Sequence, residues 1–257
     1  MELDRGAAIV TGAAGGIGTC VARRLASAGM SVVMADLDGA RLAQVSEELA
    51  AEHPEAELVA VRGDVGDPEH HVELVEAARC LDGGLRLSVL NAGVSVPGLS
   101  WEVPLETWEL TTRVNYWGVV HGLRAALDEF ADPSAGRTGW VVAVASGAGL
   151  VATPGLAPYV ATKHAVVGMM EATHRELARV GSPSGVSVVC PGNIATPMPS
   201  RNESIPGASA YPEVLESIEA AVVSGVEAGA DPSTVADVIV EGVAEERFWL
   251  MPQPEIA

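Results

Sequence analysis

A tyrosine and a lysine four residues apart, Tyr159 and Lys163, form the strongest candidate for acid–base chemistry in this sequence. Side chains at this spacing share one face of a helix, and Pro158 is typical of a helix start. A tyrosine with its ordinary pKa of about 10 is a poor base at neutral pH, but a neighbouring ammonium lowers that pKa by stabilising the phenolate. The pair therefore predicts a group that exchanges a proton with a substrate. The same spacing also occurs on ordinary helix surfaces, so this interpretation depends on partners elsewhere in the chain.

Two polar residues supply such partners. Ser146 directly follows an apolar run of strand length, Trp140–Ala145, where a hydroxyl can bond a substrate carbonyl or the alkoxide that develops from it. Asn115 lies inside a helical pattern, Leu105–Glu129, where asparagine is unfavourable. We interpret Asn115 as a local kink whose backbone carbonyl would hold a water against Lys163. A helix residue with ordinary, satisfied hydrogen bonds is the alternative.

A glycine-rich turn lies near the start of the chain, between the strand candidate Ala7–Val10 and the helix candidate Ile17–Ala28. Gly12, Gly16 and Gly18 stand there in a G-x-x-x-G-x-G pattern. Glycines allow a tight turn and a close approach to a pyrophosphate, while the N–H groups at a helix start favour an anion. Any turn from strand to helix can need a glycine, but the position of this one in the first β-α unit favours a dinucleotide site.

Acidic residues follow the next two strand candidates. Asp36 ends the second, where a carboxylate can accept hydrogen bonds from both ribose hydroxyls and would repel a 2′-phosphate. Because the turn Ala13–Gly15 contains no lysine or arginine, NAD is expected rather than NADP. Asp64, followed by Val65, comes after the third strand and can bond the adenine amino group. An ordinary turn aspartate is the alternative for each position.

The fourth strand candidate is followed by Asn91, Ala92 and Gly93, where small residues leave room for an adenosine. In open α/β sheets, ligands bind beyond the carboxyl ends of the strands. We therefore expect these three residues to lie along one edge of a sheet with Asp36 and Asp64, and to form the nucleotide site with them.

Apolar runs of strand length alternate with helical patterns along the whole chain. Most runs are continuously apolar, which is typical of strands buried on both faces. The alternation predicts an α/β fold of the Rossmann type, with a doubly wound parallel sheet of about seven strands in a single domain over residues 1–257. Residues 193–212 interrupt it with a stretch rich in proline, serine and glycine, which we interpret as a substrate lid. The strand candidates are Ala7–Val10, Ser31–Ala35, Leu58–Arg62, Leu85–Leu90, Trp140–Ala145, Val186–Cys190 and Phe248–Met251; the helix candidates include Ile17–Ala28, Ala40–Glu52, Pro68–Cys80, Leu105–Glu129 and Tyr159–Val180.

Composition excludes several classes of function. The net charge of −19 and the scattering of only 15 lysines and arginines disfavour nucleic-acid binding. Three widely spaced cysteines predict neither a disulfide framework nor a metal site, which fits a reducing compartment. Because no apolar run has the length of a signal peptide or a membrane span, we expect a cytoplasmic protein. The pair His70-His71 lies in an acidic helical pattern, and we interpret it as solvent-exposed and assign it no metal.

Taken in order, these motifs resemble those of the short-chain dehydrogenase/reductase (SDR) family over essentially the whole chain. The resemblance implies a catalytic tetrad of Asn115, Ser146, Tyr159 and Lys163. It adds Pro191, Gly192, Ile194 and Thr196 to the cofactor site, with Ile194 and Thr196 at the nicotinamide amide, and implies that the following loop closes over the substrate. The matching residues are Thr11–Gly18, Asp36, Asp64-Val65, Asn91-Ala92-Gly93, Asn115, Ser146, Tyr159, Lys163, Pro191-Gly192 and Thr196.

The implied activity is that of an NAD-dependent oxidoreductase acting on CH-OH groups. Tyr159 as phenolate takes the proton of an alcohol positioned by Ser146, and a hydride passes from the carbinol carbon to C4 of the nicotinamide. Lys163 steadies the phenolate and holds the nicotinamide ribose, while a water on Asn115 relays the proton to solvent. Family members usually form dimers or tetramers through the helix of Tyr159 and the helix Leu105–Glu129, so a homo-oligomer is expected.

Two alternatives stay open at this point. A carbonyl reductase using NADH or NADPH would employ the same residues in the reverse direction. A non-catalytic NAD-binding regulatory protein is the alternative from another class, but no member of the tetrad is missing. The predicted lid holds few charges, Arg201 and Glu203, and nearby residues such as Trp101, Val151 and Leu156 are apolar. We therefore expect a weakly polar secondary alcohol or ketone as substrate, with steroid- or terpenoid-like molecules included.

Overall fold

The chain folds around one seven-stranded parallel sheet in the order β3-β2-β1-β4-β5-β6-β7. The computed structural model describes residues 1–131, 136–196 and 209–253. From β1 the chain winds outward to β3, then crosses back to β4 and winds outward in the other direction. This reversal confirms the doubly wound, Rossmann-type α/β fold. The strands are β1 Ala7–Thr11, β2 Ser31–Asp36, β3 Leu58–Arg62, β4 Leu85–Leu90, β5 Trp140–Val144, β6 Gly185–Val189 and β7 Trp249–Leu250.

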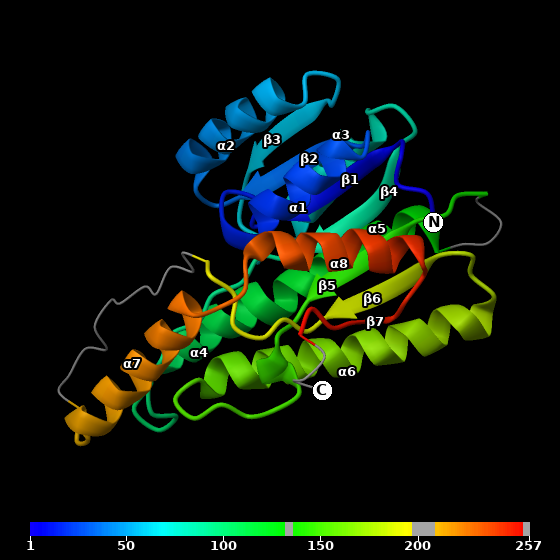
Figure 1. Ribbon diagram of the computed structural model, residues 1–257. Helices are drawn as coiled ribbons and strands as arrows, with labels where there is room; N and C mark the ends of the chain where they lie inside the picture. The colour runs from blue at the N-terminus through cyan, green and yellow to red at the C-terminus, as the bar shows by residue number, and fades with distance from the viewer. Residues whose placement is uncertain (132–135, 197–208, 254–257) are drawn as a thin grey trace.

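Helices cover both faces of the sheet, as Figure 1 shows. Helices α1, α2 and α8 pack on one face, and α3, α5 and α6 pack on the other. Helix α7 projects away from the sheet at the end where α4 lies (Figure 1). The helices are α1 Gly16–Ser27, α2 Gly39–Glu52, α3 Pro68–Arg79, α4 Leu105–Thr112, α5 Gly118–Phe130, α6 Ala157–Val180, α7 Pro212–Glu227 and α8 Pro232–Ala244.

The continuous apolar runs become strands that are buried on both faces. All five residues of β1 are buried. Successive side chains of a strand point to opposite faces, and accordingly Ala8 and Val10 join the core beneath α1 and α8, while Ala7 and Ile9 join the core beneath α3 and α5. Two hydrophobic cores, one for each face, therefore hold the carboxyl ends of the strands in fixed relative positions.

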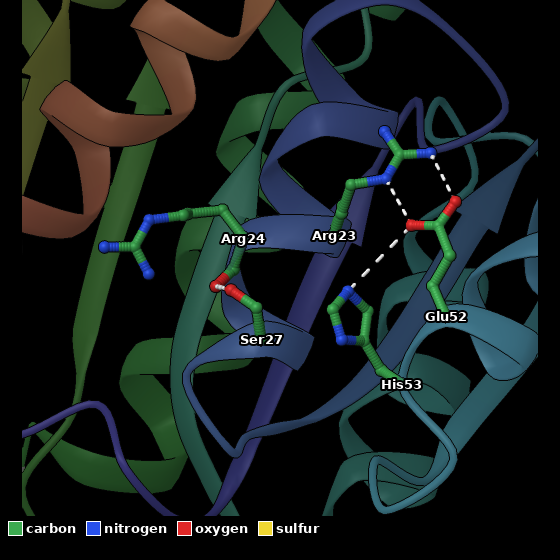
Figure 2. A network of polar contacts seen from close by, with 5 residues as sticks. All are labelled: Arg23, Arg24, Ser27, Glu52 and His53. Atoms are coloured by element: carbon green, nitrogen blue, oxygen red, sulfur yellow. Dashed lines mark hydrogen bonds and ion pairs between the residues drawn. The ribbon is translucent and has the colours of Figure 1, made fainter.

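At the surface, α1 and α2 are also tied by charged side chains (Figure 2). Arg23 Nε of α1 donates to Glu52 Oε2 of α2 at 2.7 Å, and the ring of His53 lies 4.0 Å from the same carboxylate oxygen. The Oγ of Ser27 donates to the backbone carbonyl of Arg24 at 2.8 Å. Exposed pairs of this kind contribute little to stability, so the apolar cores described above fix the fold.

The helix expected over Leu105–Glu129 is interrupted. It consists of α4 and α5 joined by one π-helical turn, Arg113–Trp117, which contains Asn115. A π-helical turn inserts an extra residue and bends the axis, so the expected kink at Asn115 is confirmed. Two helices after the sixth strand, α7 and α8, lie where we assigned none from the sequence. The outer strands β5, β6 and β7 also end one residue earlier than we expected.

No helix in the described part of the chain is both long enough and apolar enough to cross a bilayer. Of the predicted lid, residues 197–208 lie outside the described residues, with Arg201 and Glu203 among them. The residues at its two ends, 193–196 and 209–212, are described.

Candidate active site

The glycine turn is shaped by close packing at its two ends. Gly12 and Gly16 have φ angles of +66° and +53°, in the left-handed region that favours glycine. A Cβ at Gly18 would lie 2.0 Å from the carbonyl oxygen of Gly12, so α1 can leave β1 at this angle only with glycine there. A Cβ at Gly16 would lie 2.9 Å from Cγ2 of Thr196, which shows that the turn after β1 and the loop after β6 meet.

Asn91 holds this turn to the end of β4. Its Nδ2 donates to the backbone carbonyls of Thr11 at 2.9 Å and Gly12 at 3.2 Å. In return, the Oγ1 of Thr11 accepts from the backbone N–H groups of Asn91 at 3.0 Å and Ala92 at 3.1 Å. Asn91 thus lies at the expected sheet edge, but its side chain serves to fix the glycine turn. Thr11 was expected only as the first residue of the glycine-rich motif, and its role as the partner of Asn91 was not anticipated.

The carboxylate of Asp36 lies at the end of β2, as expected, and closes the same turn. Its Oδ2 accepts from the N–H of Ala14 and its Oδ1 accepts from the N–H of Asp38, both at 3.0 Å. Each carboxylate oxygen has a second lone pair, so these bonds leave acceptor capacity for ribose hydroxyls. Asp36 is partly exposed.

Asp64 is held by partners that we did not anticipate. Its Oδ1 accepts from the N–H of Gly66 at 2.8 Å, and its Oδ2 is paired with the guanidinium of Arg113 from the π-helical turn. Burial acts to raise the pKa of Asp64, but the bonds from Arg113 and Gly66 outweigh it and hold that pKa below its ordinary value. The loop that carries Asp64 and the turn that carries Asn115 are therefore coupled by charge.

The prediction that His70 and His71 are exposed is wrong, because both are buried, at 5% and 3% exposure. The ring of His70 fills the space beneath Gly63, where a Cβ would lie 2.2 Å from it. Nε2 of His71 bonds the backbone carbonyl of Val65 at 2.9 Å. Burial lowers the pKa of His71 to about 4, so it stays neutral near pH 7. The pair supports the loop of Asp64 and Val65 from below.

Lys163 and Tyr159 lie on the first turns of α6, on the side facing the end of β5. Lys163 is 3% exposed, and its Nζ donates to the backbone carbonyl of Val144 at 2.7 Å. The same Nζ lies 5.5 Å from the centre of the Tyr159 ring. Burial lowers the pKa of Lys163 to about 8. The two side chains are thus brought together as expected, beside the strand end that carries Ser146.

The expected lowering of the tyrosine pKa is not seen in the protein alone. Burial raises the pKa of Tyr159, and a hydrogen bond with Ser146 acts in the opposite direction without outweighing it. The physical reason is desolvation, which disfavours the phenolate of Tyr159 and the ammonium of Lys163 alike. The ordinary pKa is 10.0 for tyrosine and 10.5 for lysine, so a raised pKa for Tyr159 and a pKa of about 8 for Lys163 move the two values apart and favour the neutral form of each group in the protein alone.

Ser146 lies two residues beyond the end of β5, in extended backbone. Its Oγ accepts from the N–H of Ala148 at 3.1 Å and lies 3.5 Å from the backbone carbonyl of Pro191. Ser146 and Tyr159 line a common cavity, and the side chain of Ser146 acts to lower the pKa of Tyr159. Both hydroxyls are thus available to a substrate oxygen bound in that cavity.

Asn115 is fully buried, and its side chain is occupied by structural hydrogen bonds. Its Oδ1 accepts from the N–H of Val94 at 2.8 Å, and its Nδ2 donates to the carbonyl of Val94 at 2.9 Å and to the Oγ1 of Thr162 at 3.2 Å. The Oγ1 of Thr162 in turn donates to the carbonyl of Tyr159 at 2.7 Å. Asn115 thus links the π-helical turn, the loop after β4 and α6. The role of Thr162 was missed, although its place next to Lys163 was a usable signal.

A cavity of about 670 Å³ lies between these groups and α7. Its floor carries the candidate catalytic side chains, and its outer wall is mostly apolar, with Thr153 and Ser217 as its polar members. Among the described residues that line it, Lys163 is the one charged side chain. The apolar wall comprises Val151, Pro154 and Leu156 from the loop after β5 and Ile218, Ala221, Val222 and Val226 from α7. The residues on α7 are spaced so that they share one helix face.

Seven of the candidate cofactor residues also line this cavity. They come from the ends of β1, β4 and β6 and are Ile17, Asn91, Gly93, Pro191, Gly192, Ile194 and Thr196. Asp36, Asp64 and Val65 lie further along the same sheet edge, at the ends of β2 and β3. The sheet edge therefore brings the sequence-predicted residues together in a single row, with nucleotide candidates at one end and catalytic candidates at the other.

The residues present fit a dinucleotide. Helix α1 begins at Gly16 without a side-chain cap, and a Cβ at the N-cap residue Gly15 would meet no other atom within 4 Å. The first N–H groups of α1 therefore face open space that an anionic pyrophosphate can occupy. A Cβ at Gly93 would lie 3.6 Å from Nζ of Lys163, so the bare backbone there leaves the ammonium open to a ribose. The described residues contain no cluster of three or more side chains suited to a metal ion.

Comparison with known proteins gives consistent results. A family model described as short chain dehydrogenase matches residues 6–205. The chain is 41% identical over 200 residues to a 1-deoxy-11-beta-hydroxypentalenate dehydrogenase of Streptomyces avermitilis, which covers 77% of this chain and 72% of that protein. A Streptomyces exfoliatus protein of the same name is 34% identical over 252 residues, 97% of this chain and 84% of that protein. A short chain dehydrogenase/reductase from Burkholderia phymatum, solved in complex with NAD, has a TM-score of 0.90 at 31% identity, over 100% of this chain and 92% of that one.

Proposed function

The chain belongs to the short-chain dehydrogenase family, and we propose that it is an NAD-dependent oxidoreductase acting on a weakly polar secondary alcohol or the corresponding ketone. One observation carries the proposal: Tyr159, Lys163 and Ser146 line the floor of a cavity whose described outer wall is mostly apolar. An acid–base group placed in such a cavity can exchange a proton with an alcohol whose remaining surface is hydrophobic.

In this mechanism Ser146 and Tyr159 hold the substrate oxygen between their hydroxyls. Tyr159 takes the alcohol proton in the oxidative direction and returns it in the reductive direction. Lys163 stabilises the phenolate by its charge, since its Nζ lies beside the ring. Asn115 keeps the first turn of α6 in position through Thr162. Burial of the whole group keeps bulk water from competing for the proton.

A nicotinamide dinucleotide, when bound, supplies the hydride acceptor at C4 and a positive charge that offsets the raised pKa of Tyr159. The N-terminus of α1 would hold its pyrophosphate, and Lys163 its nicotinamide ribose. We propose NAD as the preferred form because Asp36 would face the adenine ribose and would repel a 2′-phosphate. The Burkholderia phymatum structure in complex with NAD supports this preference.

The relatives support the class of substrate. The Streptomyces proteins are named for a hydroxylated compound, 1-deoxy-11-beta-hydroxypentalenate. We propose that the substrate of this chain shares the hydroxyl group of that compound but lacks its carboxylate. Lys163 is the one charged side chain among the described residues that line the cavity, and the mechanism already assigns its charge to the phenolate. The cavity of about 670 Å³ would be shared by the substrate and the nicotinamide end of the cofactor, because candidate cofactor residues line it as well.

The experiment that tests the proposal is a panel of secondary alcohols, measured with NAD by the absorbance of the reduced nicotinamide. The panel pairs weakly polar members, such as substituted cyclohexanols and hydroxysteroids, with charged ones such as 3-hydroxybutyrate. We expect kcat/KM to be at least about tenfold higher for the weakly polar set. A preference for the charged set would overturn the substrate class, and no turnover of any alcohol or ketone would overturn the activity.

Three further predictions from the sequence belong with this proposal. The enzyme works in the cytoplasm, forms a homodimer or homotetramer, and has no nucleic-acid partner. The net charge of −19 supports the last of these.

A further inference from the structure

The C-terminal tail reaches the loop that follows β6. The side-chain amide of Gln253, which belongs to this tail, makes hydrogen bonds to two consecutive residues of the loop. Its Oε1 accepts from the backbone N–H of Gly192 at 2.9 Å, and its Nε2 donates to the backbone carbonyl of Asn193 at 3.3 Å. Gln253 comes just after the short edge strand β7 and lies far from Gly192 in sequence, so nothing local in the chain indicated this contact.

The contact continues the pairing of two parallel strands. Val189 of β6 is paired with Leu250 of β7, and the N–H of Cys190 donates to the carbonyl of Leu250 at 3.0 Å. Gln253 and Gly192 each lie three residues beyond that pair. Pro191 and Pro252 stand in between, and proline has no N–H to donate. The side chain of Gln253 therefore replaces the main-chain ladder where the two prolines end it.

A second element holds the same loop from its other side. The N–H of Ala230, after α7, donates to the carbonyl of Asn193 at 3.0 Å, and the carbonyl of Ala230 accepts from the N–H of Ala195 at 2.9 Å. The carbonyl of Asn193 thus accepts from both Ala230 and Gln253. Ile194 lies between these supports, is 6% exposed and lines the cavity.

We propose that Gln253 is a positioning residue that fixes residues 192–194 against the nicotinamide end of the cofactor. The inference rests on the proposed function, because it assumes that a nicotinamide dinucleotide binds in this cavity. Gln253 acts through the backbone of Gly192 and Asn193 and does not touch the reacting groups. Loss of its amide frees one side of the loop, so the nicotinamide end of the site should loosen while the adenine end, at β2 and β3, stays intact.

The experiment compares two ligands that differ by the nicotinamide. The variant Gln253→Met keeps the length of the side chain and removes both hydrogen bonds. NADH binding is followed by nicotinamide fluorescence, and ADP-ribose binding by calorimetry. We expect the Kd of NADH to rise roughly tenfold, the equivalent of two ordinary hydrogen bonds, and the Kd of ADP-ribose to stay within about twofold.

A matched control makes the same chemical change elsewhere. Gln44 on α2 donates to Glu48 at 2.9 Å at the exposed surface, and Gln44→Met should leave both affinities unchanged. A second variant, Gln253→Glu, keeps the acceptor for Gly192 and loses the donor to Asn193, so it should weaken NADH binding by a smaller factor. It also serves if Gln253→Met does not fold.

The outcomes separate this inference from the proposed function. If the wild-type protein binds neither NADH nor NADPH, the proposed function fails. If the wild type and the Gln253 variants bind NADH equally well, the positioning role is overturned. It is also overturned if the variants lose affinity for NADH and for ADP-ribose by the same factor.

Discussion

The two halves of the sheet edge treat their polar side chains in opposite ways. In the nucleotide half, at the ends of β1 to β4, Asp36, Asp64 and Asn91 are bonded to backbone groups of the turns at this edge. In the catalytic half, at the ends of β5 and β6, Lys163 is buried with a single backbone acceptor, and burial shifts the pKa of both Lys163 and Tyr159.

The fold is therefore most ordered in the nucleotide half, and its reactive groups lie in the catalytic half. Polar groups with several hydrogen bonds are stable and rigid, which suits a surface that must match a fixed ligand. Desolvated ionisable groups are less stable in their charged forms, which suits groups that must change protonation during a reaction. Substitutions in each half can test this division.

Removing the tyrosine hydroxyl should affect the catalytic half alone. We expect Tyr159→Phe to lower kcat by about 10³-fold, because the proton loses its acceptor, while the Kd of NADH stays within about twofold. Steady-state turnover and nicotinamide fluorescence measure the two quantities. Tyr211→Phe removes a hydroxyl from a half-exposed tyrosine at the start of α7 and serves as the control. Unchanged turnover in Tyr159→Phe would refute the mechanism.

Two glycines of the nucleotide half should respond differently to the same substitution. Gly18→Ala places a Cβ 2.0 Å from a backbone carbonyl oxygen, so we expect it to destabilise the fold by about 3 kcal/mol. Gly15→Ala places a Cβ in open space on extended backbone, so the fold should keep its stability. If that space holds the pyrophosphate, Gly15→Ala should instead weaken NADH binding by roughly tenfold or more.

Chemical denaturation and NADH titration of the two glycine variants decide the matter. Equal stability losses in both would mean that the turn is uniformly packed. If Gly15→Ala keeps the full affinity for NADH, the start of α1 is excluded as the pyrophosphate site.

The buried histidine of the nucleotide half should make the fold acid-sensitive. The pKa of His71 is about 4 in the folded protein and ordinarily 6.5, so the unfolded chain binds the extra proton between these values. Stability is therefore complete above pH 6.5 and is lost as the pH falls from 6.5 toward 4, by on the order of 2 to 3 kcal/mol. Urea unfolding across this range measures the loss. The variant His71→Gln should flatten it, and an unchanged pH profile in that variant would assign the acid sensitivity to other groups.

The smallest effect should come from the charge of Asp36. Asp36→Asn is expected to shift the ratio of NADPH to NADH affinity by about tenfold toward NADPH, since the repulsion of a 2′-phosphate is removed. The lost bond to one backbone N–H weakens both coenzymes alike, so the ratio isolates the effect of charge. If the wild-type protein binds NADPH as tightly as NADH, Asp36 does not select the cofactor.

Much of this site was accessible from the sequence because its parts are local. The glycine turn, Asp36 and the pair Tyr159 and Lys163 each depend on a neighbouring strand or helix that the apolar pattern reveals. Asn115 was detectable for the same reason, since asparagine inside a helix signals a disturbance, and the π-helical turn is that disturbance.

The remaining features depend on packing between distant segments. The partners Arg113 for Asp64, Thr11 for Asn91 and Gln253 for Gly192 come from other elements, and no periodicity links them. The burial of His70 and His71 was missed because an acidic helix looks exposed until its buried face is known. The apolar wall of α7 was likewise not expected.

The order of the strands along the chain, and the residue types at their carboxyl ends, could be derived from the amino-acid sequence, because burial on both faces of a parallel sheet leaves a continuous apolar signature. Which polar groups are satisfied and which are desolvated depended on the tertiary structure. That distinction sets the direction of the pKa shifts of Tyr159 and Lys163, since desolvation depends on what covers a side chain and not on its neighbours in the chain.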